Sequence, residues 1–177
     1  KYISKYINKK ITLFSMSHIP RTTLAQNMDA LSSQSNIAGY KATIIGADYI
    51  PKYMPLLMTA AGTIRPSKVL ILGAGVAGLA AIANAKRMGA QVFAFDVRPV
   101  VKEQVESLGA KFVEVESNSD EGVGEGGYAK EVSEEYKKKQ GELIKTTIKS
   151  MDLVISTALI PERPAPILID RQMVESM

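Results

Sequence analysis

The sequence predicts an α/β fold with a doubly wound parallel sheet, and two patterns support this prediction. From Pro66 onward, apolar runs typical of strands alternate with helical patterns, as a parallel sheet with right-handed crossover helices requires. The first of these runs leads directly into the glycine-rich turn GAGVAG, residues 73–78. With 177 residues, 46% of them hydrophobic, the chain is long enough to bury a substantial core.

Residues 1–62 are expected to form part of a second α/β subdomain, together with helices that link it to the main sheet. Residues 9–16 have the pattern of a strand. Residues 33–49 carry small and apolar side chains at helical spacing, and residues 53–61 form a second amphipathic stretch that closes at Gly62. We expect these helices to pack as one layer against the main sheet.

Residues 63–177 are expected to form the main sheet and its covering helices. Four strands are predicted, at residues 68–73, 91–96, 111–116 and 152–159. After Lys68 the first is a continuous apolar run, as a strand buried on both faces should be. The third alternates in polarity, which favours a position nearer the sheet edge. Helices are predicted at residues 76–88, from Pro99 to Gly109, and over roughly twenty residues that end near residue 148.

The composition argues against several classes of function. Cysteine is absent and His18 is the single histidine, so no metal site is expected. The net charge of +4 comes partly from scattered lysines without interleaved aromatic residues, which favours solvated helix faces over a nucleic-acid interface. The uncharged run at residues 69–85 is interrupted by three glycines and is too short for a membrane span.

The turn GAGVAG has the context that a dinucleotide-binding fingerprint requires, because it follows a buried strand and opens a helix. In such a Rossmann-like turn, Gly73 makes the tight bend, Gly75 lets the backbone approach the pyrophosphate, and Gly78 allows close packing of helix on strand. The pyrophosphate then meets the unpaired amides at the positive end of the helix. We interpret the turn as a dinucleotide site, although glycines also serve simple turns.

Asp96 ends the second predicted strand, where this fold places an acidic group against the adenosine ribose. A carboxylate there accepts a hydrogen bond from a ribose hydroxyl, worth about 1.5 to 3 kcal/mol. It would also repel a 2′-phosphate, so NAD is favoured over NADP. Arg98 weakens this preference, because it could pair with a phosphate, hold Asp96 or reach the pyrophosphate.

Residues 20–29, PRTTLAQNMD, gather Arg21, Gln26 and Asp29 in a segment with the propensity of a loop. Two interpretations stay open. The segment is either a capped helix start with solvated polar side chains, or a polar clamp for a carboxamide. The spacing does not decide between them.

Five stretches carry a family resemblance: PRTTLAQNMDALSSQSNIAGY, MPLLMTAAGTIRPSKVLILGAGVAGLAAIANAKRMGA, DVRPVVKEQVESLGAKF, GGYAKEVSEEYKKKQ and TALIPERPAP. They resemble the NAD(H)-binding domain, domain I of the alpha-subunit type, of proton-translocating NAD(P) transhydrogenase. The resemblance implies a dimeric domain that passes hydride between NAD(H) and NADP(H), the latter held by a separate domain. A membrane domain of the same enzyme would couple this transfer to proton movement.

The resemblance also implies a location. The segment itself would be soluble, on the cytoplasmic or matrix side. It would be associated with a membrane of the inner-membrane type only through the other domains of the enzyme.

The chain begins at Lys1 without a methionine and stops at Met177 within a helical pattern. We therefore expect an excerpt of a longer protein, with an incomplete dinucleotide-binding sheet.

Site residues follow from the resemblance as well. The nicotinamide loop would use Arg21, Gln26, Asp29 and Ser32 as the candidate catalytic residues, in the sense of positioning. Further contacts in that loop are implied for Thr22, Thr23, Asn27 and Met28, while Leu24 replaces a basic residue often seen there. The remaining cofactor contacts are implied for Gly73, Gly75, Val76, Ala77, Gly78, Asp96, Val97, Arg98, Gln140 and Leu159.

Residues 120–132, DEGVGEGGYAKEV, combine glycines with acidic residues and match the family's mobile loop at Gly127 and Tyr128. Composition alone favours a disordered surface insertion. With the resemblance, we expect a lid that closes over bound NAD(H), because glycine permits the rearrangement that a hinge needs.

The expected chemistry is direct hydride transfer from NADH to NADP⁺. Both reacting groups belong to cofactors, so the protein needs no nucleophile and must place the two rings about 3 to 3.5 Å apart. Two alternatives stay open. An alanine dehydrogenase resembles the same nucleotide fold and has a similar segment at residues 159–166, and a non-catalytic NAD-binding module would bind NADH without transferring hydride.

Overall fold

The computed structural model describes residues 3–20, 22–115, 133–159 and 164–177. By its internal contacts the chain divides into two compact units, residues 1–34 and 35–177. The division at residues 62 and 63 that the family resemblance implies stays a prediction.

The first unit is built from short helical segments. They are α1 (Ile3–Ile7), the 3₁₀ helices η1 (Met16–His18) and η2 (Thr23–Met28), and the start of α2 (Ala30–Tyr49). The strand predicted at residues 9–16 is wrong: Ile11, Leu13 and Phe14 are exposed and lie in irregular backbone. A strand needs a neighbour for its backbone hydrogen bonds, and the described residues of this unit contain no other strand.

The second unit contains a parallel sheet of four strands in the order β5-β4-β3-β6. The strands are β3 (Lys68–Leu72), β4 (Gln91–Phe95), β5 (Lys111–Phe112) and β6 (Leu153–Ser156). The first strand in sequence therefore lies inside the sheet and the third lies at its edge, as their polarity patterns predict. Both β5 and β6 are shorter than predicted.

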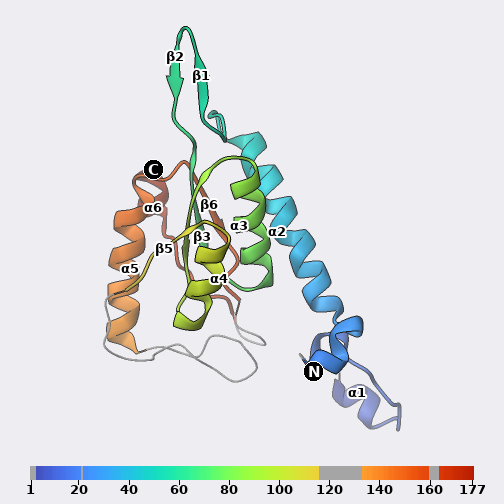
Figure 1. Ribbon diagram of the computed structural model, residues 1–177. Helices are drawn as coiled ribbons and strands as arrows, with labels where there is room; N and C mark the ends of the chain where they lie inside the picture. The colour runs from blue at the N-terminus through green and yellow to red at the C-terminus, as the bar shows by residue number, and fades with distance from the viewer. Residues whose placement is uncertain (1–2, 21, 116–132, 160–163) are drawn as a thin grey trace. The chain divides into compact units, whose positions relative to one another are not determined.

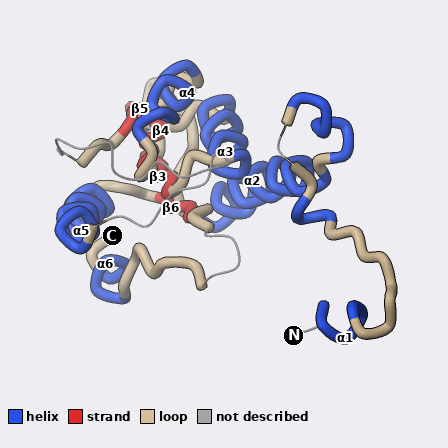
Figure 2. Tube along the Cα trace, turned by 90° about the horizontal axis from the view of Figure 1, so that it is seen from below, coloured by secondary structure: helices blue, strands red, loops and turns tan. Residues whose placement is uncertain are grey.

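Helices cover both faces of this sheet, and the strands send alternate side chains to each face. Val69 and Ile71 of β3 pack in one apolar cluster with α3 (Val76–Arg87) and α4 (Lys102–Ser107), which follows the 3₁₀ helix η3 (Pro99–Val101). Leu70 and Leu72 pack in the other with α5 (Glu134–Ile148) and α6 (Arg171–Glu175). Figure 2 shows α3 and α4 on one side of the strands and α5 and α6 on the other. The predicted doubly wound α/β fold is confirmed.

Within the second unit, α2 packs closely on α3 because it presents small residues to it. A Cβ atom added to Gly39 would lie 2.0 Å from the carbonyl oxygen of Ala77. One turn later, the buried Thr43 hydroxyl donates to the Ala81 carbonyl at 3.3 Å. The helix predicted at residues 33–49 is confirmed, since α2 spans Ala30–Tyr49, and these contacts place its second half against α3.

The helix predicted at residues 53–61 is wrong. The segment instead contributes to an antiparallel hairpin of β1 (Leu57–Thr59) and β2 (Gly62–Ile64). Pro55 disfavours a continuous helix, and Gly62 adopts a φ of 143°, which a residue with a side chain rarely adopts. In Figure 1 the hairpin extends away from the sheet, so the apolar residues of its strands are exposed.

Asp152 ties three segments together at the amino ends of the strands. Its Oδ2 atom accepts hydrogen bonds from Lys52 Nζ and from the backbone N–H of Lys68, each at 2.7 Å. Burial by itself would raise the pKa of Asp152, but these hydrogen bonds and the charges of Lys52 and Lys68 outweigh it and hold the pKa below its ordinary value. The folded state therefore favours the ionised carboxylate.

We expect Gly39→Ala to lower the free energy of unfolding of the full native polypeptide by about 1 to 3 kcal/mol, because the new methyl group overlaps the Ala77 carbonyl. Urea unfolding measures this change. Gly141→Ala in α5 is the matched control, since its added Cβ would meet nothing within 4 Å. It should be neutral or stabilising by about 0.4 to 1 kcal/mol, and equal effects of both substitutions would contradict the close packing of α2 on α3.

We also expect the stability of the protein to fall in acid partly through Asp152. A carboxyl whose pKa is lowered by folding stabilises the protein above its unfolded pKa of about 3.9, and this contribution is lost as the pH falls through the lower folded value. Urea unfolding between about pH 6 and pH 3 should therefore show a smaller loss of stability for Asp152→Asn than for the parent protein. Parallel losses would rule out this role.

Candidate functional site

The glycine-rich turn lies at the carboxyl end of β3 and leads into α3. Gly73 adopts a φ of 98°, and its N–H donates to the carbonyl of Phe95 at the end of β4 at 2.8 Å. The first hydrogen bond of α3 runs from Leu79 N–H to the Gly75 carbonyl at 2.8 Å. The N–H groups of Val76, Ala77 and Gly78 precede it and have no partner within the helix, as in any first helical turn.

Gly75 and Gly78 have different surroundings. A Cβ atom added to Gly78 would lie 1.8 Å from the Gly73 carbonyl oxygen, so a side chain there would disrupt the turn. A Cβ atom added to Gly75 would meet nothing within 4 Å. The open space beside Gly75 adjoins the unpaired N–H groups, so the turn fits an anionic group such as a pyrophosphate.

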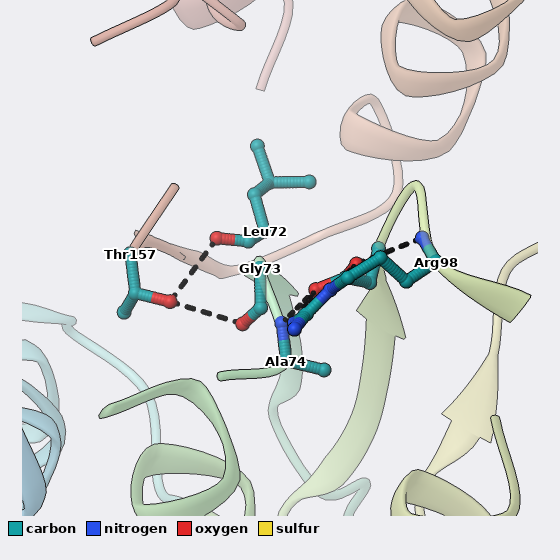
Figure 3. A network of polar contacts seen from close by, with 6 residues as sticks. Leu72, Gly73, Ala74, Arg98 and Thr157 are labelled. Atoms are coloured by element: carbon teal, nitrogen blue, oxygen red, sulfur yellow. Dashed lines mark hydrogen bonds and ion pairs between the residues drawn. The ribbon is translucent and has the colours of Figure 1, made fainter. Parts of the chain in front are cut away.

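Asp96 follows β4 and is joined to this turn. Its Oδ2 atom accepts hydrogen bonds from the Ala74 backbone N–H at 2.7 Å and from Arg98 Nη2 at 2.8 Å. Its Oδ1 atom accepts from the backbone N–H and from Nε of Arg98, each at 2.9 Å. Arg98 could have paired with a phosphate, held Asp96 or reached the pyrophosphate. In this structure it holds Asp96. Figure 3 shows Arg98 reaching back towards Ala74.

The electrostatics of this pair follow from its burial and its hydrogen bonds. Burial by itself would raise the pKa of Asp96, but hydrogen bonds from the Arg98 side chain and from the Ala74 and Arg98 N–H groups outweigh it, so the pKa lies below its ordinary value. The hydrogen bond to Asp96 raises the pKa of Arg98 in turn. The two side chains form an ion pair with only 6% of the Asp96 side chain exposed.

Thr157, directly after β6, is a contact of the turn that the sequence did not single out. Its Oγ1 atom donates to the Gly73 carbonyl at 3.0 Å and lies 3.4 Å from the Leu72 carbonyl oxygen (Figure 3). The strand topology could have indicated this contact, because the carboxyl ends of parallel strands meet at one edge of a sheet. Placing Thr157 there required knowing that β6 pairs with β3.

The predicted nicotinamide loop lies in the first unit. Asp29 follows η2, and its carboxylate accepts hydrogen bonds from the Ser32 N–H at 2.9 Å and from the Ser32 hydroxyl at 2.6 Å. Asp29 therefore caps the start of α2, as the capped-helix interpretation predicts. The side chains of five further residues are exposed: Thr22, Thr23, Gln26, Asn27 and Met28.

The other predicted contacts are distributed over the second unit. Val97 is half-buried beside Asp96, Gln140 is buried on α5, and Leu159 is exposed after β6. Arg21, Gly127 and Tyr128 lie outside the residues that the structure describes. The structure thus brings together the glycine turn, Asp96 and Arg98 in one unit, and Asp29 with Ser32 in the other.

Comparison with solved structures supports this architecture. The crystal structure of transhydrogenase from Sinorhizobium meliloti is 51% identical and superposes with a TM-score of 0.80, over 93% of this chain and 43% of that one. The fold of this chain is therefore similar to the matching part of that transhydrogenase.

Sequence comparison points in the same direction. The chain is 53% identical over 170 residues to the first part of the NAD(P) transhydrogenase alpha subunit from Rhodospirillum rubrum, and the alignment covers 96% of this chain and 44% of that protein. Alanine dehydrogenase 2 of Staphylococcus aureus is 28% identical over 156 residues, with 86% and 36% covered. The chain thus spans less than half the length of these relatives.

A family model described as the C-terminal domain of alanine dehydrogenase/PNT matches residues 42–177, which is most of the chain. The match includes the whole sheet, the glycine turn and Asp96. Together with the relatives at about 50% identity, it confirms the predicted resemblance to the transhydrogenase alpha subunit. The chain belongs to the alanine dehydrogenase/PNT C-terminal domain family.

Proposed function

We propose that the chain is the NAD(H)-binding part of a proton-translocating NAD(P) transhydrogenase. The observation that carries this proposal is the glycine turn at the start of α3, joined to Asp96 through the Ala74 N–H at 2.7 Å. This arrangement offers an anion site and a ribose acceptor side by side, as a bound dinucleotide requires. The identity of about half the residues to a transhydrogenase alpha subunit supports the assignment over other dinucleotide enzymes.

In this proposal the second unit holds NAD(H). The N–H groups of Val76, Ala77 and Gly78 donate to the pyrophosphate, and the open side of Gly75 admits it. Asp96 accepts hydrogen bonds from the ribose hydroxyls. Since an ionised carboxylate offers about four acceptor positions and all are taken, Arg98 must release one of its bonds to Asp96 when the ribose enters.

The first unit would position the nicotinamide. Arg21 and Asp29 would orient the carboxamide, Ser32 would keep the Asp29 carboxylate in place through its two hydrogen bonds, and Gln26 would extend towards the second nicotinamide. The bound NADH supplies the hydride, and NADP⁺ on the partner domain accepts it. These residues act by placing the two rings within reach of each other, because neither nucleophile nor metal is needed.

The rest of the enzyme belongs to the same proposal. An NADP-binding domain and a membrane domain that moves protons would be the partners, with two copies of this chain forming a dimer and residues 62 and 63 dividing the family's subdomains. Among the described helices none has the length and hydropathy that a membrane span needs. The likeness to transhydrogenase relatives supports membrane association through the other domains, with this chain on the cytoplasmic or matrix side.

Two other functions are compatible with the family. An alanine dehydrogenase would use the same nucleotide fold, and a regulatory module would bind NADH without chemistry. The lower identity to alanine dehydrogenase, 28% against 53%, favours the transhydrogenase.

The proposal is tested by mixing the full native polypeptide with the NADP-binding domain of a transhydrogenase. NADH and an NADP⁺ analogue should exchange hydride, while alanine and pyruvate should give no reaction. Gln26→Ala should slow hydride transfer by about ten- to hundredfold through misplaced rings and leave the Kd for NADH nearly unchanged. Gln104→Ala, at an exposed position of α4, is the matched control. NADH binding without hydride transfer would identify a regulatory module, and turnover of alanine would identify the dehydrogenase.

We expect Asp96→Ala to raise the Kd for NADH by about ten- to hundredfold, because it removes charge-assisted hydrogen bonds to the ribose. The same substitution frees Arg98 to meet a 2′-phosphate, so the preference for NADH over NADPH should shrink. Fluorescence titration with both nucleotides measures these changes. Asp48→Ala, on the exposed side of α2, serves as the control, and an unchanged nucleotide preference in Asp96→Ala would refute the role of Asp96.

A further inference from the structure

The peptide group between Gly73 and Ala74 is hydrogen-bonded at both of its ends. The two partners lie directly after the neighbouring strands β4 and β6. Its N–H belongs to Ala74 and donates to Asp96 Oδ2 at 2.7 Å, next to β4. Its carbonyl belongs to Gly73 and accepts from the Thr157 hydroxyl at 3.0 Å, next to β6. We propose that Thr157 is a positioning residue for dinucleotide binding, which fixes this peptide group and with it the amides that would receive the pyrophosphate.

The backbone holds Thr157 in place independently of its side chain. Its N–H donates to the Leu72 carbonyl at 2.8 Å and so extends the pairing of β3 with β6 by one residue. The side chain then reaches across the end of β3 to the turn (Figure 3). The hydroxyl can therefore be removed without removing the residue from the sheet.

The glycines of the turn leave the space that this hydroxyl fills. A Cβ atom added to Gly73 would lie 2.9 Å from Thr157 Oγ1, and one added to Gly78 would lie 3.1 Å from it. The hydroxyl thus lies beside both glycines, and it donates a hydrogen bond to the carbonyl of Gly73. A methyl group of the same size would fill the space but could not donate a hydrogen bond.

The link from Thr157 to the anion site passes through the Gly73 carbonyl. This oxygen would lie 1.8 Å from a Cβ atom on Gly78, so it packs directly on the first turn of α3. Rotation of the peptide group would drive the oxygen against that turn or away from it, and it would also break the bond from Ala74 to Asp96. Holding the carbonyl therefore holds the orientation of the first-turn N–H groups.

This inference rests on the proposed function, and its test separates the two. In the full native polypeptide, Thr157→Val should weaken binding of NADH and of ADP-ribose by about tenfold, the effect of losing about one hydrogen bond. Adenosine, which lacks the pyrophosphate, should bind within about twofold of the parent, as should NADH to the conservative variant Thr157→Ser. Isothermal titration gives all three affinities.

The control is Thr147→Val in α5, which also removes a half-buried hydroxyl bonded to a backbone carbonyl, that of Leu143 at 2.8 Å. It should leave the affinity for NADH unchanged. If Thr157→Val does not fold, Thr157→Ala replaces it, because alanine also lacks the hydroxyl.

Three results would overturn the inference while leaving the proposed function intact. They are unchanged NADH binding in Thr157→Val, an equal loss for adenosine and NADH, or no recovery in Thr157→Ser. If the parent protein itself binds no NADH, the proposed function fails and the inference fails with it.

Discussion

The organisation of the second unit depends on the turn between β3 and α3. The chain must leave the centre of a buried sheet, reverse its direction and begin a helix within the residues 73–76, and it does so with Gly73 at a φ of 98°. The turn donates a hydrogen bond to Asp96, which follows β4, and accepts one from Thr157, which follows β6. These contacts connect the sheet order to the site, since only a strand order that places β3 between β4 and β6 brings those segments together.

Much of this arrangement could be predicted because it is local in the sequence. The apolar run of β3, the glycine spacing and the polarity of β5 each depend on neighbouring residues alone. The structure confirms the inner strand, the turn into a helix and the edge strand that they predict. Asp96 could be placed for the same reason, because it directly follows a strand. Its pairing with Arg98 was one of several possibilities, and only the structure selects it.

The features that escaped prediction depend on partners distant in the sequence. The apolar pattern of residues 9–16 is suited to a strand but has no described neighbour to pair with in its unit. Residues 53–61 have helical periodicity, yet Pro55 and the turn at Gly62 favour a hairpin. The contact of Thr157 with Gly73 joins residues 84 positions apart, and a single hydroxyl leaves no periodic signal.

The ion pair of Asp96 and Arg98 also bears on how an anionic ligand approaches the turn. An uncompensated carboxylate beside the amides would repel a pyrophosphate as it arrives, but here the guanidinium lies 2.8 Å from the carboxylate and cancels its charge at longer range. Within the screening distance of about 8 Å at physiological ionic strength, an approaching anion would therefore meet an ion pair with almost no net charge, next to the positive end of α3. In the proposed function the carboxylate would bind the ribose only after this first contact, once Arg98 releases one of its hydrogen bonds to Asp96.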